Sequence, residues 1–220
     1  ADLRWEWYPS RSEIITVAAF YKHFINPIEM FFVPGSGSGG TRDFTFGNAE
    51  YSQSIGAEVE ARKLFFLGTA DKDKGVITIL GNIAYIYSKV ELGEQAVAQS
   101  DNRPMMGQSP FIVNLGVFYE HTPSRWQANL MYNVIGARIF AVGTAFNPDI
   151  YELPRNQLDL TITKGFGKRF ELKAGVQDLL NSRFRLVQDS NEDGKIGGVD
   201  EEIMTYREGV YITAGFNVKF

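Results

Sequence analysis

The stretch from Asp189 to Asp200, DSNEDGKIGGVD, contains the residue types and spacing that could hold a metal ion. Asp189, Asn191, Asp193 and Asp200 stand first, third, fifth and twelfth, with a glycine sixth and Lys195 seventh. A 12-residue calcium loop takes side-chain oxygens from the first, third, fifth and twelfth positions and a backbone carbonyl from the seventh. We therefore expect a possible Ca²⁺ site made by Asp189, Asn191, Asp193, Lys195 and Asp200.

This stretch departs from a full EF-hand in two respects. A predicted strand precedes it in place of a helix, and Asp200 is shorter than the bidentate Glu usual at the twelfth position. It is more similar to the D-x-N-x-D-G loops of dockerin-like repeats, which also end in Asp. The alternative is an acidic, glycine-rich loop that stays solvated, although so many carboxylates close together should repel one another unless a cation intervenes.

No other motif predicts catalysis. Residues 35–40, GSGSGG, satisfy G-x-G-x-x-G, but no helix follows to receive a pyrophosphate, so we expect a loop there. His23 and His121 are the only histidines and lack metal-ligand spacing. Ser109 is followed by Pro110 and fits the start of a strand better than a nucleophile. We expect that the protein is not an enzyme.

Composition excludes several other classes of protein. The chain has 220 residues, a formal net charge of -4 and no cysteine. The acidic balance argues against a nucleic-acid partner, and the lack of cysteine excludes disulfides and thiolate metal sites. Its mean hydropathy is -0.17, and no run approaches the ~18 to 20 apolar residues of a membrane helix.

Apolar and polar residues alternate along most of the chain, as in the final segment GVYITAGFNVKF, residues 209–220. A period of two predicts strands with one apolar face, and we count nine such strands and no helix. We expect one face to carry Leu3, Val59, Val117, Leu130, Leu160, Leu172 and Ala214. We expect the other face to carry Glu6, Glu58, Glu60, Arg62, Asp159, Glu171 and Lys173.

The predicted connections alternate between short turns and long polar loops. The long loops cover residues 26–48, 91–108, 144–154 and 184–208, and aromatic residues gather near the short turns. Short turns at one end, long loops at the other and rows of aromatics are typical of membrane β-barrels. The predicted fold class is all-β, an antiparallel transmembrane barrel wall with short periplasmic turns and long external loops.

Four segments resemble strand motifs of TonB-dependent outer-membrane receptors. They are FYKHFINPIE (20–29), RPMMGQSPFIVNLGVFYE (103–120), RNQLDLTITKGFG (155–167) and GVQDLLN (175–181). The end, TAGFNVKF, is similar to the signal read by the barrel-assembly machinery. The resemblance implies that Thr213, Gly215, Val218 and Phe220 form this signal.

The same resemblance implies a 22-stranded barrel around an N-terminal plug, of which this chain contains neither the plug nor the TonB-contacting segment. Single-chain bacterial barrels have even strand numbers, so nine strands cannot be a complete barrel. We therefore expect residues 1–220 to be the C-terminal portion of a larger receptor barrel.

The expected function is import of a scarce nutrient (a siderophore, vitamin, glycan or peptide) across the Gram-negative outer membrane. The expected partners are membrane lipid, the rest of the barrel, the assembly machinery and, through the plug, the TonB complex. Two alternatives remain open: a passive or structural outer-membrane barrel, and a soluble calcium-binding β-sandwich. The ligand-binding residues are unknown at this point.

Overall fold

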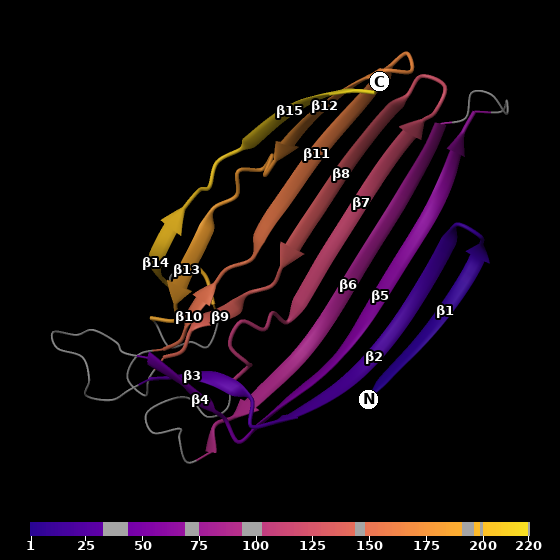
Figure 1. Ribbon diagram of the computed structural model, residues 1–220. Helices are drawn as coiled ribbons and strands as arrows, with labels where there is room; N and C mark the ends of the chain where they lie inside the picture. The colour runs from indigo at the N-terminus through magenta and orange to yellow at the C-terminus, as the bar shows by residue number, and fades with distance from the viewer. Residues whose placement is uncertain are drawn as a thin grey trace.

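The computed structural model describes residues 1–32, 44–68, 75–93, 103–143, 148–190, 196–198 and 200–219. Strands dominate these residues, and nine of the strands form one antiparallel sheet, the wall, which is twisted and curved (Figure 1). Its strands, in spatial order, are β1 (Asp2–Ser10), β2 (Glu13–Ile25), β5 (Tyr51–Leu67), β6 (Gly75–Glu91), β7 (Phe111–His121), β8 (Trp126–Ile135), β11 (Arg155–Phe166), β12 (Phe170–Gln177) and β15 (Tyr211–Val218).

The register of the wall confirms the predicted division into two faces. Directly opposed residues share a face, and the pairs Val117↔Leu130 and Leu130↔Leu160 continue one apolar row across three strands. The same registers place all seven predicted apolar residues on one face, which we call the apolar face. The seven predicted charged residues lie on the opposite, polar face.

The aromatic residues near the short turns follow this division with two exceptions. Trp5, Trp7 and Trp126 lie on the apolar face and are half exposed. Tyr8, however, donates a hydrogen bond to Glu6 on the polar face, and Phe66 pairs with Val76 on that face. The aromatic row therefore belongs to the apolar face, but not every aromatic residue near a turn is part of it.

Two smaller sheets lie at the end of the wall where the long connections gather (Figure 1). We call this the connection end. One sheet pairs β3 (Ile28–Phe32) with β4 (Phe44–Asn48). The other has the order β14 (Glu201–Tyr206), β13 (Phe184–Gln188), β10 (Ile150–Glu152), β9 (Arg138–Ala141). The predicted long loops at 26–48, 144–154 and 184–208 therefore contain short strands, which the sequence did not reveal because strands of three to six residues are too short to show a clear period.

The best-buried apolar side chains also lie at the connection end. Val90 and Leu92 at the end of β6 pack with Ala49, and Met105 lies against this cluster. In the wall, by contrast, large side chains of the apolar face are open to solvent: Leu3 is 75% exposed and Ile212 is 76% exposed. A continuous exposed apolar face of this size requires a covering partner or lipid.

The described residues contain no helix long and apolar enough to cross a membrane.

Gly56 on β5 marks a close approach of two strands. A Cβ added there would lie 2.7 Å from the backbone oxygen of Tyr85, and the Phe20 ring covers the same position. We expect Gly56→Ala to lower the free energy of unfolding by about 1 to 3 kcal/mol, because the backbone of β6 must move. Gly165→Ala is the comparison, since the three atoms nearest to a Cβ there all belong to the Arg125 side chain and none to the backbone. Equal urea midpoints for the two folded variants would contradict this account.

Candidate functional site

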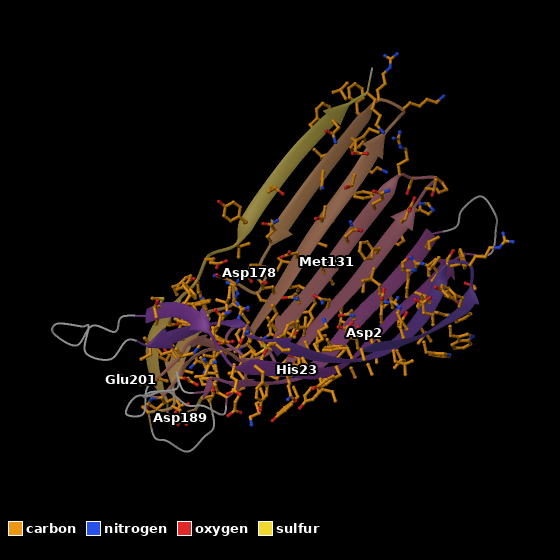
Figure 2. All side chains as sticks on the ribbon, turned by 60° about the horizontal axis from the view of Figure 1, so that its bottom comes forward. Asp2, His23, Met131, Asp178, Asp189 and Glu201 are labelled. Atoms are coloured by element: carbon orange, nitrogen blue, oxygen red, sulfur yellow. The ribbon has the colours of Figure 1, made fainter. Side chains whose placement is uncertain are left out.

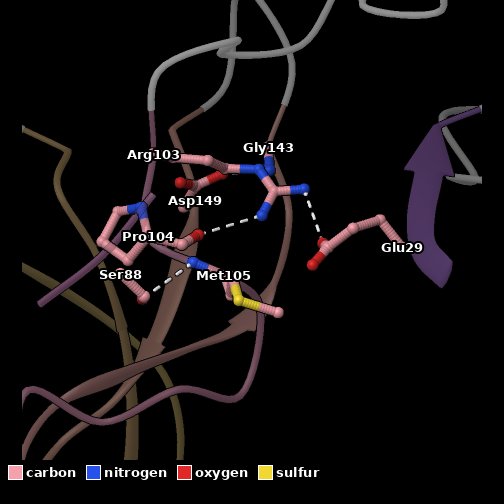
Figure 3. Close-up of polar contacts among 7 residues, drawn as sticks. All are labelled: Glu29, Ser88, Arg103, Pro104, Met105, Gly143 and Asp149. Carbon is pink, nitrogen blue, oxygen red and sulfur yellow. Dashed lines mark hydrogen bonds and ion pairs between the residues drawn. The ribbon is translucent and has the colours of Figure 1, made fainter. Parts of the chain in front are cut away.

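A buried ion pair joins two of the long connections (Figure 3). Arg103 lies in the connection between β6 and β7. Its Nη2 atom is 3.1 Å from Oε2 of Glu29 in β3. Both side chains are 3% exposed. Arg103 also donates a hydrogen bond to the Pro104 carbonyl at 3.1 Å, while its Nε atom is buried and has no hydrogen-bond partner among the described residues. Since removing one member of such a pair leaves an uncompensated buried charge, Arg103 and Glu29 hold the two connections together.

The segment after Arg103 is fixed to β6 by further hydrogen bonds. The Val90 amide donates to the Arg103 carbonyl at 3.0 Å, and the Met105 amide donates to Oγ of Ser88 at 3.3 Å (Figure 3). Ser109, the candidate nucleophile that we assigned to a strand start, is buried and donates to the carbonyls of Phe111 and Gly136. It joins the beginning of β7 to the end of β8, which confirms the structural interpretation of this serine.

A third connection, between β8 and β11, approaches the same region. Asp149 accepts a hydrogen bond from the Gly143 amide at 2.5 Å, and this bond links two described parts of the connection (Figure 3). Burial raises the pKa of the Tyr151 phenol, the negative charges of Asp149 and Asp189 raise it further, and Arg103 opposes them. The phenol therefore stays protonated at neutral pH and remains a hydrogen-bond donor at the connection end.

A polar cavity of about 460 Å³ opens between β11, β12 and the start of β15. Asp159, Asp178 and Glu208 give it a negative charge, and Glu208 is paired with Arg155 at 3.0 Å. The other lining residues are Gln157, Gln177, Gly209 and Tyr211. The alternating pattern predicts which of these residues lie on the polar face, but it does not show that they surround a cavity, because Asp178 and Glu208 follow or precede the strands.

The structure describes only part of the predicted calcium loop. Asp189 and Asp200 lie at the connection end, after β13 and before β14, with Asp189 and Glu201 near each other at this end in Figure 2. Oδ2 of Asp200 accepts a hydrogen bond from the Gly197 amide at 2.7 Å, and its Oδ1 is buried without a hydrogen-bond partner in the part of this loop that the structure describes. The other predicted ligands, Asn191, Asp193 and Lys195, lie outside the described residues, as does the 35–40 glycine segment. Within the described ranges, no group of three or more His, Cys, Asp or Glu residues could hold a metal ion.

The predicted assembly signal lies on the last strand of the wall. Thr213 and Gly215 face the polar side, opposite Gly175 and Lys173 of β12, and Val218 faces the apolar side opposite Phe170. Phe220 lies outside the described residues. The two histidines are in different parts of the wall: His23 contacts the ring of Tyr51 near the connection end, whereas His121 hydrogen-bonds to Ser124 at a short turn.

Sequence reasoning did not find the pair Arg103–Glu29, although both residues lie within the segments quoted for the resemblance. A charged residue next to a predicted strand usually indicates a solvated connection. Only the structure shows that Arg103 and Glu29, which are 74 positions apart in the sequence, form a buried contact.

Comparison with models of known protein families identifies the family to which the wall belongs. The family model "TonB dependent receptor-like, beta-barrel" matches residues 1–179, which include eight of the nine wall strands. Searches of curated proteins and of solved structures found no match. The matched family consists of outer-membrane transport receptors. With its two-faced antiparallel wall and a family match over most of its length, this chain belongs to the TonB-dependent receptor β-barrel family.

Proposed function

We propose that this chain forms part of the wall of a receptor that imports a scarce nutrient across the outer membrane of Gram-negative bacteria, with energy supplied through TonB. Family membership supports this assignment, and the exposed apolar face of the wall is the observation that carries the membrane topology. In this topology the apolar face contacts lipid and the polar face lines the lumen. The connection end lies outside the cell and the short turns lie in the periplasm.

We further propose that additional strands and a lumen-filling plug complete the receptor. In the described residues β1 and β15 are each paired on one side only, so the wall is an open sheet. On the polar face, Leu80, Phe118 and Met131 surround Gly116 and form an apolar patch, with Met131 37% exposed. Figure 2 shows Met131 near the middle of the wall. An apolar patch inside a polar lumen would be covered by a packed domain, as a plug would provide.

The cavity beside Asp159 and Asp178 lies on the lumen side near the connection end, where an incoming solute would pass. The direct test of function is uptake by cells that produce the intact receptor, with and without TonB. TonB-dependent accumulation of a siderophore, vitamin, glycan or peptide would support the proposal. Uptake that continues unchanged without TonB would instead support a passive barrel.

The last strand has a second proposed role, in assembly. Thr213, Gly215, Val218 and Phe220 would present the unpaired edge of β15 to the barrel-assembly machinery before the barrel closes. The pairing of β15 with β12 alone is consistent with a free edge available for this contact. This role stays a prediction.

We also propose that Ca²⁺ orders the connection from Asp189 to Asp200. Oδ1 of Asp200 is buried and has no partner among the described residues, which supports this proposal, because a buried carboxylate oxygen without a partner is costly. We expect calcium to protect this connection from protease in the intact receptor, and Asp193→Ala to remove the protection. A calcium titration that leaves the cleavage rate of the unmodified receptor unchanged would contradict a calcium site.

A further inference from the structure

Lys164 places a positive charge on the apolar face of the wall, at the short-turn end of β11. It pairs directly with Trp126 of β8 and Leu172 of β12, in a row of this face that is otherwise apolar. Phe166, two residues further along β11, lies on the same face. A cation on a face that contacts lipid is costly unless its charged end reaches the headgroups, and a position two residues before the end of the strand allows this.

The ammonium group of Lys164 is held by two aromatic rings and one carbonyl. Its Nζ lies 4.8 Å from the centroid of the Trp126 ring and 6.0 Å from that of the Phe166 ring. Nζ also donates a hydrogen bond to the Ser124 carbonyl, in the turn between β7 and β8. An ammonium group has three N–H donors, and the described residues supply this one acceptor, so two donors remain for another acceptor.

Lys164 differs in its charge balance from the other two lysines that the wall strands place on the apolar face, Lys63 and Lys89. The Lys63 ammonium lies 2.7 Å from a carboxylate oxygen of Glu13, and the Lys89 ammonium lies 3.5 Å from one of Glu91. No carboxylate within the described ranges pairs with Lys164. Of these three ammonium groups, Lys164 is therefore the one whose charge the described residues leave unbalanced.

Two further cations follow Lys164 in the short turn after β11. Lys168 and Arg169 are exposed, and the turn, residues 167–169, contains no acidic residue. Glu171, the first carboxylate after this turn, lies on the polar face and points away from Lys164. The apolar side of this turn is therefore positively charged, although the whole chain has a net charge of -4.

We propose that Lys164, Trp126 and Phe166 form a binding site for the headgroup of one anionic phospholipid in the periplasmic leaflet. The phosphate oxygens accept hydrogen bonds from Nζ of Lys164, and an acyl chain follows the apolar face past Ile162, which is 37% exposed. The inference rests on the membrane topology proposed above, which puts the short turns at the phospholipid leaflet of the outer membrane. Charge complementarity carries it, because a cation between aromatic rings at the edge of an apolar surface matches an anionic headgroup.

The test is native mass spectrometry of the intact receptor after incubation with equal amounts of phosphatidylglycerol and phosphatidylethanolamine. We expect a preference for phosphatidylglycerol, because the ammonium of phosphatidylethanolamine already compensates its phosphate. Lys164→Met should lower phosphatidylglycerol retention about fivefold, the factor that one lysine near an anionic surface contributes. Lys173→Met is the matched control, since it removes the same charge from the neighbouring strand β12 but on the polar face. Lys164→Arg should retain the preference, because a guanidinium also binds phosphate.

Equal phosphatidylglycerol retention by the unmodified receptor and Lys164→Met would overturn the proposal and leave Lys164 only its contact with the Ser124 carbonyl. An equal loss in Lys173→Met would also overturn it, since net charge alone would then explain the preference. Displacement of the lipid by inorganic phosphate, beyond the effect of chloride at the same ionic strength, would indicate a site for free phosphate instead. Cell fractionation separates these results from a failure of the proposed function, because a receptor that is absent from the outer membrane contradicts the topology itself.

Discussion

Replacing Arg103 by alanine is expected to destabilise the packing of the connection end by about 3 to 5 kcal/mol. The substitution leaves the Glu29 carboxylate, now 3% exposed, without the cation that compensates its burial. The loss should be local, because the pair joins β3 to the segment before β7 and not two strands of the wall. Faster amide exchange at Val90, whose N–H donates to the Arg103 carbonyl, would report it.

Two controls separate the buried charge from other effects of this substitution. Arg185→Ala breaks the exposed pair with Glu202, in which both side chains are about a third exposed, and should cost about 0 to 1 kcal/mol. The double variant Arg103→Met with Glu29→Leu removes both charges and should recover much of the lost protection. Equal exchange at Val90 in Arg103→Ala and the unmodified receptor would show that the pair does not hold the connections.

Introducing arginine at Leu130 should lower the free energy of unfolding in lipid by about 2 to 4 kcal/mol. Leu130 lies within β8 on the apolar face, paired with Val117 and Leu160, so the guanidinium would have to enter hydrocarbon. Asn129→Arg is the matched control, because the neighbouring residue lies on the polar face beside Phe118 and Thr161. Its arginine would point away from hydrocarbon, toward the lumen, and should cost much less.

Urea unfolding of the intact receptor in vesicles measures both variants under the same conditions. A larger loss for Asn129→Arg than for Leu130→Arg would reverse the assignment of the two faces. Similar small losses for both would indicate that neither face contacts hydrocarbon, as in a soluble sandwich.

The wall was predictable because its strands are long. Over the 17 residues of β5, the period of two repeats often enough to assign residues to a face. The short turns were predictable for a related reason, since two alternating runs separated by a few polar residues form a hairpin. Ser109 shows that local chemistry also helps, because the following proline excluded a nucleophile and favoured the strand start that the structure contains.

The connection end was not predictable in the same way. Strands such as β10, with three residues, and β13, with five, carry too few positions for a period, and their pairing depends on contacts far apart in sequence. The ion pair of Arg103 with Glu29 and the cavity beside Asp178 were not predictable for the same reason, because both depend on contacts between residues far apart in the sequence.

The most direct test of the central claim, that one face of this wall contacts lipid and the other lines a hydrated lumen, is cysteine labelling in the intact membrane. These 220 residues contain no cysteine, so no other thiol of this part of the wall would react. Val117→Cys and Leu130→Cys should react with a lipid-phase probe, and Asn114→Cys and Asn129→Cys with a water-soluble one, because the registers place these pairs on opposite faces. Reversed labelling at both pairs, or water-soluble labelling at all four positions, would contradict the account.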